Sequence, residues 1–253
     1  MSSDARAIPA AALLLALTAG ALHAQEPATA RLSGIPRDVA CAPASPLVRP
    51  KPTIKVVAGR DSRKTLFGNG DAVVISGGTA QGLKNGDEFY VRRIVGDQFT
   101  EAVKGGAVPI SIHTAGMVRI AEAQTDVSIG VVTYGCDGIV EGDYLERFAP
   151  EPLPAGAVGN TPDFTRPGHI IMGDDRRQMG GPGEFVIIDR GSDHGVRLGQ
   201  QVTIFRRTLA DGSGPVMTVG TAMVYVVKPQ SSVVRLERSV DAVYVGDFIA
   251  LHR

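Results

Sequence analysis

The sequence contains no tryptophan, and aromatic residues make up only 5% of its 253 residues. It also lacks an excess of either charge, because 26 Lys and Arg residues balance 26 Asp and Glu residues. A strongly basic binder of nucleic acid or of an anionic membrane is therefore excluded. The 43% apolar content is too high for a disordered chain. The 31 glycines and 16 prolines favour many short strands over long helices.

Long apolar stretches are absent except near the N-terminus. Arg6 precedes an apolar run over residues 10–17, and small residues follow as far as Ala24. We therefore expect residues 1–24 to be a signal peptide and the mature protein to be periplasmic or secreted, without a transmembrane segment. Cleavage after Ala21 and cleavage after Ala24 both fit the small-residue rule. The alternative is a membrane anchor, but this run is shorter than the about 20 apolar residues that a span requires.

Cysteine is also scarce, with only Cys41 and Cys136 in the chain. In an oxidising compartment an even pair predicts one disulfide, which would tie the N-terminal tail to the first domain. Closing this loop would be worth about 4–5 kcal/mol in the chain-entropy model. The alternatives are two independent thiols and a lipoprotein anchor at Cys41, and Arg37 and Asp38 disfavour the anchor because they separate Cys41 from the apolar run.

An internal repeat is the most informative pattern that the sequence contains. Residues 70–78 align with residues 183–191, an offset of 113. In the back half the offset becomes 104, and the change is confined to the stretch between Arg93 and Gly116, as expected for a surface loop. The aligned turn residues are Gly78, Gly82, Gly86, Gly142 and Asp143 in the first copy, and Gly191, Gly195, Gly199, Gly246 and Asp247 in the second.

Proline-rich stretches separate the two copies, and prolines favour an extended connector because they cannot donate to a sheet. The predicted organisation is a signal peptide (1–24), a Pro-rich N-terminal tail (25–52), a first β-barrel repeat (53–148), a Pro-rich linker (149–167) and a second β-barrel repeat (168–253).

Short β-branched runs bounded by Gly, Asp or Pro predict five or six strands in each copy. The runs cover residues 54–58, 72–75, 89–91, 127–132 and 144–148, and then 185–188, 202–205, 222–227, 231–236 and 243–250. We predict an all-β protein with two tandem small antiparallel β-barrels. A sandwich is the alternative, but closure is favoured because so few strands otherwise leave exposed edges.

The repeated glycines are interpreted as structural turns, since glycine adopts positive φ without a steric penalty. Leu83 and Val196 lie between the turn glycines and should point inward to close one end of each barrel.

The sequence shows no catalytic or metal-binding spacing. His113, His169, His194 and His252 are scattered singly, and no His-x-x-x-His or Cys-x-x-Cys pattern occurs. The best candidate joins Asp193-His194 to Asp174-Asp175, but Asp193 and His194 lie inside a glycine turn, where a solvated loop explains them. We therefore predict no catalytic residue, no cofactor and no metal site.

One loop hints at a docking surface. The stretch from Ile94 to Ala115 is longer than its counterpart in the second copy and carries Phe99, Val108 and Ile110. Apolar residues on a long loop can contact a protein partner, although they can also simply extend a hairpin.

The second copy resembles a known family. It reads Val-Ile-Ile-Asp-Arg-Gly-Ser-Asp-His-Gly-Val-Arg-Leu-Gly-Gln at residues 186–200, followed by Val-Gly-Thr-Ala, Ser-Ser-Val-Val-Arg-Leu and Val-Gly-Asp. This pattern resembles the C-terminal barrel of flagellar assembly protein T. It is also similar to barrels found beside peptidoglycan-binding LysM domains, and more distantly to those of the rod-shape protein C family. The resemblance implies small β-barrels that act in cell-envelope assembly and have no chemistry of their own.

These observations predict an exported, non-catalytic adaptor or scaffold of the bacterial cell envelope that contacts an envelope protein through strand edges or loops. The runner-up is a peptidoglycan-binding module, although the chain contains no recognisable LysM segment. An uncharacterised hydrolase is the third hypothesis. A nucleic-acid partner is not expected, because a basic stripe interleaved with aromatic residues is missing.

Overall fold

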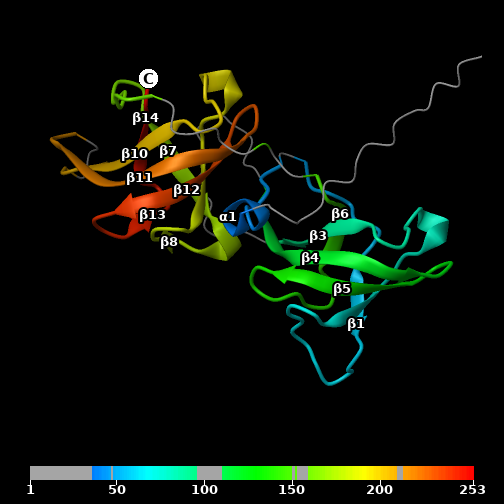
Figure 1. Cartoon of the computed structure of the whole chain (residues 1–253). Coiled ribbons are helices and arrows are strands. Elements are labelled where there is room, and N and C mark those ends of the chain that lie inside the picture. Colours follow the sequence, from blue (N-terminus) through cyan, green and yellow to red (C-terminus); the bar gives the residue numbers. More distant parts are fainter. Residues whose placement is uncertain (1–35, 47, 96–109, 150–151, 153–158, 210–212) are drawn as a thin grey trace, which may run out of the picture.

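The computed structural model describes residues 36–46, 48–95, 110–149, 152, 159–209 and 213–253. The expected signal peptide lies outside the described residues, as do parts of the tail and the linker. A four-residue helix, α1 (Arg37–Ala40), precedes two antiparallel β-units (Figure 1). In this described part of the chain, no helix is long and apolar enough to cross a bilayer.

The first unit is a curled six-stranded sheet with the order β1-β2-β5-β4-β3-β6. Its edge strands are joined by an isolated bridge between Lys55 and Tyr144, and the Val56 N–H donates to the Asp143 carbonyl at 2.8 Å. The strands are β1 (Val56–Gly59), β2 (Ala72–Ile75), β3 (Glu88–Ile94), β4 (Ile112–Ala123), β5 (Ser128–Gly135) and β6 (Tyr144–Arg147).

The second unit is a closed barrel with the order β10-β11-β12-β9-β7-β14. Pairing of Phe248 with His169 closes it between β14 and β7, and β8 and β13 form a separate two-stranded sheet. The strands are β7 (Gly168–Gly173), β8 (Met179–Gly180), β9 (Phe185–Ile188), β10 (Gln201–Arg207), β11 (Val216–Val227), β12 (Ser232–Ser239), β13 (Val243–Tyr244) and β14 (Phe248–Leu251). The predicted all-β, antiparallel fold is confirmed, with a closed barrel in the second unit and a curled half-barrel in the first.

The two units repeat strand by strand. β2 and β3 recur 113 residues later as β9 and β10, while β4, β5 and β6 recur 104 residues later as β11, β12 and β14. Irregularities recur as well: the register shift after Val91 in β3 corresponds to the shift after Ile204 in β10. A bulge bends its strand and increases the local twist, which helps six short strands to curl into a barrel.

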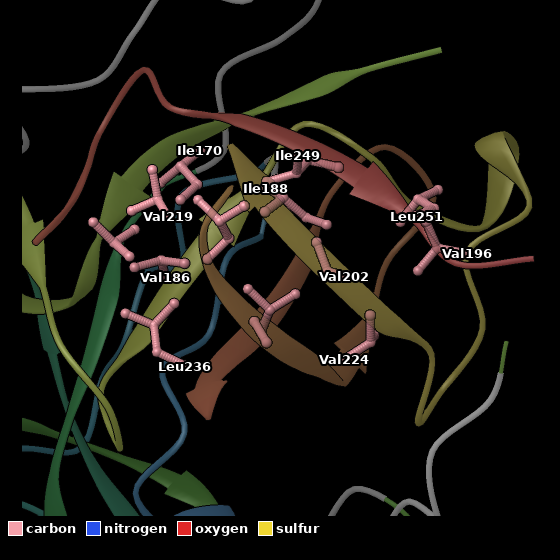
Figure 2. Close-up of a cluster of buried hydrophobic side chains, with 14 residues drawn as sticks. Ile170, Val186, Ile188, Val196, Val202, Val219, Val224, Leu236, Ile249 and Leu251 are labelled. Carbon is pink, nitrogen blue, oxygen red and sulfur yellow. The ribbon is translucent and has the colours of Figure 1, made fainter. Parts of the chain in front are cut away.

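Each unit buries its own apolar core. Figure 2 shows the core of the second barrel, where side chains from all six barrel strands gather in its interior. Leu83 and Val196 are 1% and 4% exposed and belong to the two barrel cores, as expected from their places between the turn glycines.

The strand predictions missed β4, β7 and β8, and they joined two strands into one run. β4 (Ile112–Ala123) was missed because its first seven residues are all buried, so the alternation of apolar and polar residues that marks a one-sided strand is absent. The run 243–250 is not one strand, because the turn at Gly246 and Asp247 separates β13 from β14.

The glycine interpretation needs one correction. The φ angles of Gly82, Gly86, Gly142, Gly195, Gly199 and Gly246 lie between 75° and 96°, in the left-handed region. Gly78 and Gly191 are extended instead, with φ of −144° and −138°. Glycine is required at both positions because the backbone of another segment passes very close to them. A Cβ on Gly191, for example, would lie 2.1 Å from the Lys228 carbonyl oxygen.

Each Gly-Asp turn is held by an ion pair between its buried aspartate and a partly exposed arginine. Asp143 receives two hydrogen bonds of 2.8 Å from Arg93, and Asp247 receives bonds of 2.6 and 2.8 Å from Arg206. Asp143 and Asp247 are both buried, so the two-pronged arginine contact compensates their lost hydration. One repeated Arg-Asp pair therefore holds the turn of each unit against its barrel.

Substitution of the two kinds of glycine should have different costs. Gly191→Ala introduces a Cβ into a backbone oxygen, and we expect a loss of at least about 3 kcal/mol of unfolding free energy. Gly195→Ala is the matched control, because nothing lies within 4 Å of its Cβ position and only its φ of +80° is unfavourable, at about 1–2 kcal/mol. Urea unfolding followed by circular dichroism measures both, and equal losses would contradict this explanation.

A buried carboxylate helps to close the second barrel. Asp189 follows β9 and accepts a hydrogen bond of 2.7 Å from the His169 backbone N–H of β7. Burial alone would raise the pKa of Asp189, but hydrogen bonds from His169 and the charge of Arg190 outweigh it and hold the pKa below its ordinary value. In the first barrel Ser76 has this role, since its hydroxyl accepts a bond of 3.0 Å from the Lys55 N–H.

Asp189 should make the second barrel sensitive to acid. The ionised carboxylate stabilises the fold at pH values above the unfolded pKa of about 3.9, and this contribution is lost as the pH falls through the lower folded pKa. Asp189→Ser copies the first barrel and should remove that dependence. We expect the unfolding free energies of wild type and variant to differ most near about pH 7 and to converge towards about pH 3. A difference that stays constant with pH in urea titrations would contradict the assignment.

Candidate functional site

The N-terminal segment 36–46 lies between the two barrels, where Figure 1 shows α1. Ala40 packs with Met117 of the first unit. Two residues later, Ala42 belongs to a buried cluster with Ile171 of the second unit. The segment therefore contacts both barrels and shares in a core on each side.

This segment is fixed to the first barrel at three points. A disulfide joins Cys41 to Cys136 across 95 residues of sequence, with Cα atoms 5.7 Å apart. The next carbonyl, that of Ala42, accepts hydrogen bonds of 3.0 Å from the buried Arg92 guanidinium and 2.6 Å from the Thr114 hydroxyl. The covalent link and the charged clamp thus act on adjacent residues.

The segment also covers an open strand edge. β5 pairs with β4 only from Gly116 onward, which leaves the first residues of β4 without that neighbour. Ala44 fills the gap through two hydrogen bonds of 2.9 Å with Ile112, one in each direction. An uncovered strand edge is a site of unwanted pairing, so this contact protects β4.

The expected long loop from Ile94 to Ala115 is shorter in the structure, because Ile94 ends β3 and β4 begins at Ile112. Phe99 and Val108 lie outside the described residues. Ile110 is described, and its N–H donates to the Pro46 carbonyl at 2.8 Å, so it supports the N-terminal segment.

A histidine links the two barrels directly. His113, on β4, lies with its Nδ1 atom 3.1 and 3.2 Å from the two carboxylate oxygens of Asp174 in the second unit. Its side chain is only 6% exposed. Burial lowers the pKa of His113, but the hydrogen bond to Asp174 and the charges of Asp174, Asp175 and Asp137 outweigh it and leave the pKa above its ordinary value.

Asp174 and Asp175 directly follow β7, in the short 3-10 turn η2 (Asp174–Arg176). Asp175 has φ 49° and ψ 48°, and among the residues that the structure describes it is the one non-glycine residue with positive φ. This backbone conformation costs about 1–2 kcal/mol for most residues, and Asp adopts it more readily than most. Such strain concentrates at functional sites.

His113 and Asp174 line a cleft of about 450 Å³ between the barrels. The first barrel contributes His113 and Asp137, and the second contributes Asp174, Arg177 and Glu184. Arg177 and Glu184 form an ion pair on the cleft wall. The cleft is therefore lined by charged groups of both signs, with Met179 and Phe185 beside them.

The site differs from the best candidate found in the sequence. Asp193 and His194 stay within the 3-10 turn η3 (Ser192–His194), where the Gly191 N–H donates to His194 Nδ1 at 3.1 Å. Asp174 does line a cleft, but the structure brings Asp174 and Asp175 to His113 instead of to His194. His169 pairs with Asp189, and His252 lies 2.7 Å from the Thr203 hydroxyl.

Departures from the repeat are the signal that sequence reasoning missed. At the offset of 104, His113 aligns with Met217, an exposed residue of β11. Positions that carry the same residue type in both copies build the barrels. A position whose residue type differs between the copies is free to make a contact outside its barrel. His113 does so, but its partner lies 61 residues away in the other copy, so no local spacing reveals it.

Comparison with known proteins adds no assignment: no protein-family model matches the chain, and no curated protein matches it.

Removing the disulfide should loosen the segment and destabilise the first barrel. For Cys41→Ser with Cys136→Ser we expect a loss of about 4–5 kcal/mol of unfolding free energy, because the unfolded chain regains the freedom of a long closed loop. Urea unfolding of the double variant, with the reduced wild-type protein as the control, measures this loss. An unchanged midpoint in both samples would mean that the segment is held by its non-covalent contacts alone.

Proposed function

We propose that this chain is an exported, non-catalytic adaptor or scaffold of the bacterial cell envelope. The proposal has two parts: the barrels are held together as one body, and one face of the second barrel is left open for a protein partner. The resemblance to barrels of flagellar assembly protein T points to the same role.

The first part is supported by the N-terminal segment. This segment packs on both barrels and is tied to the first barrel by a disulfide. In addition, the two barrels contact each other directly through His113 and Asp174. A disulfide persists in an oxidising compartment, which agrees with export. A scaffold benefits from such fixed geometry, because partners are then held at a defined spacing.

The observation that carries the proposal is a difference between equivalent faces. In the first barrel the opening residues of β4, 112–114, are buried beneath the N-terminal segment and the second barrel. In the second barrel the equivalent residues of β11, 216–218, are exposed. Met217 is 59% exposed there and Val216 is 38% exposed, with Leu209 nearby in the same hairpin at 55%.

Exposed apolar residues gathered on one hairpin are typical of a protein contact. The first barrel already uses this face for a protein contact within the chain. We therefore infer that the second barrel uses the same face to bind a protein partner. The partner would then contact the second barrel as the second barrel contacts the first.

The alternative is a peptidoglycan-binding module, and one observation favours it. A polar hollow beside the turn that follows β1 is lined by Arg60, Arg63 and Lys64, of which Arg63 pairs with Asp61 and Lys64 with Asp71. Basic side chains in a hollow can receive the carboxylates of peptidoglycan peptides.

Two measurements separate these functions. In co-sedimentation with purified sacculi, an adaptor should stay in the supernatant, whereas a peptidoglycan module should pellet and should be released by Arg60→Ala combined with Lys64→Ala. Pelleting that these substitutions abolish would favour the alternative.

The adaptor role predicts a specific contact at the β11 face. A photo-crosslinker placed at Met217 in cells should give one discrete adduct with an envelope protein. Leu209→Asp should abolish that adduct, because a charge on the hairpin opposes apolar packing. A crosslinker at Ile129, exposed on β5 of the first barrel, is the control and should not give the adduct. The same adduct from both positions would contradict the assigned face.

A further inference from the structure

Three potential metal ligands from the two barrels lie close together where the barrels meet. One ligand atom from each of His113, Asp137 and Asp175 lies within 4.8 Å of the others. His113 and Asp137 belong to the first barrel, and Asp175 to the second. These residues are 38 or more positions from Asp175 in sequence, so the tertiary structure alone assembles them.

The His113 ring is oriented by a carboxylate, as is usual for histidines that bind a metal. Its Nδ1 atom contacts the Asp174 carboxylate, and a carboxylate on one ring nitrogen orients the imidazole so that the other nitrogen can bind a metal. The other nitrogen, Nε2, is buried and makes no hydrogen bond within the described part of the chain. Its nearest acid is Asp137, with an oxygen at 3.5 Å.

One of these distances already matches the spacing of ligands around a small divalent ion, and the third ligand lies within reach of the other two. Zinc binds imidazole nitrogen and carboxylate oxygen at about 2.0–2.2 Å, which places neighbouring ligand atoms of a tetrahedral site about 3.3 Å apart. The separation of 3.5 Å between His113 Nε2 and Asp137 is already close to that value. Asp175 is the third residue of the group, and it lies in a turn where its own φ is positive.

We propose that His113, Asp137 and Asp175 bind a zinc ion between the two barrels, with Asp174 as the positioning residue of His113. Calcium and magnesium are disfavoured, because they prefer sites made only of oxygen ligands and require more of them. Three protein ligands leave at least one coordination position for water or for an acidic group that enters the cleft.

The ion would join the barrels at a point where the chain already brings them together. Asp137 directly follows Cys136, so the disulfide that holds the N-terminal segment also places one ligand. The site thus combines with the segment to hold the two barrels in one arrangement. The inference does not depend on the adaptor role, because it concerns binding by the isolated protein.

Isothermal titration of zinc into the metal-stripped mature chain, with its disulfide intact, tests the site. We expect one zinc per chain with a Kd in the micromolar range or below, and weaker binding of calcium. Asp137→Asn and Asp175→Asn should each weaken zinc binding at least about tenfold. Asn retains the ability to adopt positive φ, so Asp175→Asn should leave the fold intact.

Asp241→Asn is the matched control, since Asp241 is the repeat equivalent of Asp137 and bonds to Arg206 rather than to a histidine. Its zinc affinity should equal that of the wild type. X-ray absorption of the zinc-loaded protein should show one imidazole, oxygen neighbours and no sulfur. Absent binding, calcium bound more tightly than zinc, unchanged affinity in both aspartate variants, or sulfur in the coordination shell would each overturn the proposal. Absent binding would instead support a protonated His113 held between Asp174 and Asp137.

Discussion

The arrangement of the two barrels depends on the backbone of residues 41 and 42. Cys41 is bonded covalently to Cys136, and the carbonyl of Ala42 receives hydrogen bonds from the buried Arg92 and from Thr114. A buried guanidinium needs acceptors, and the segment supplies one of them, beside Thr114 and Glu146 of the first barrel. Because Ala42 also belongs to a core cluster of the second barrel, this same point places the barrels next to each other.

Duplication explains both the likeness of the barrels and their division of work. The shared features are those that a small barrel needs: bulged strands, turn glycines and an Arg-Asp pair that anchors the last turn. The differing features lie on faces that point away from the barrel interior. His113 and Met217 occupy the same place on the two barrels, and one is buried in the contact between units while the other is exposed. A substitution at a position outside the core changes the stability of the barrel little, so such a position can acquire a contact with another unit.

Much of the fold could be predicted from the sequence because barrel strands are local and repeated. β2 and β9 were predicted with the bounds that they have, since both are short β-branched runs between turn signals. β4 could not be predicted in the same way. Its early residues are covered on both faces by elements far away in the chain, which removes the alternating pattern. The linker also showed a non-local effect: residues 159–167 pack on the second barrel, where Asp163 bonds to Arg253.

The sequence by itself determined the β class, the duplication, the turn positions and the inward places of Leu83 and Val196, because each follows from residue type and short-range spacing. Only the tertiary structure decided that Gly191 serves close approach rather than a left-handed turn, and that His113 meets Asp174 and Asp175. The physical reason is the same in both cases. Contacts across a barrel or between two barrels depend on distances between segments that are remote in sequence, and such distances leave no periodic mark on the chain.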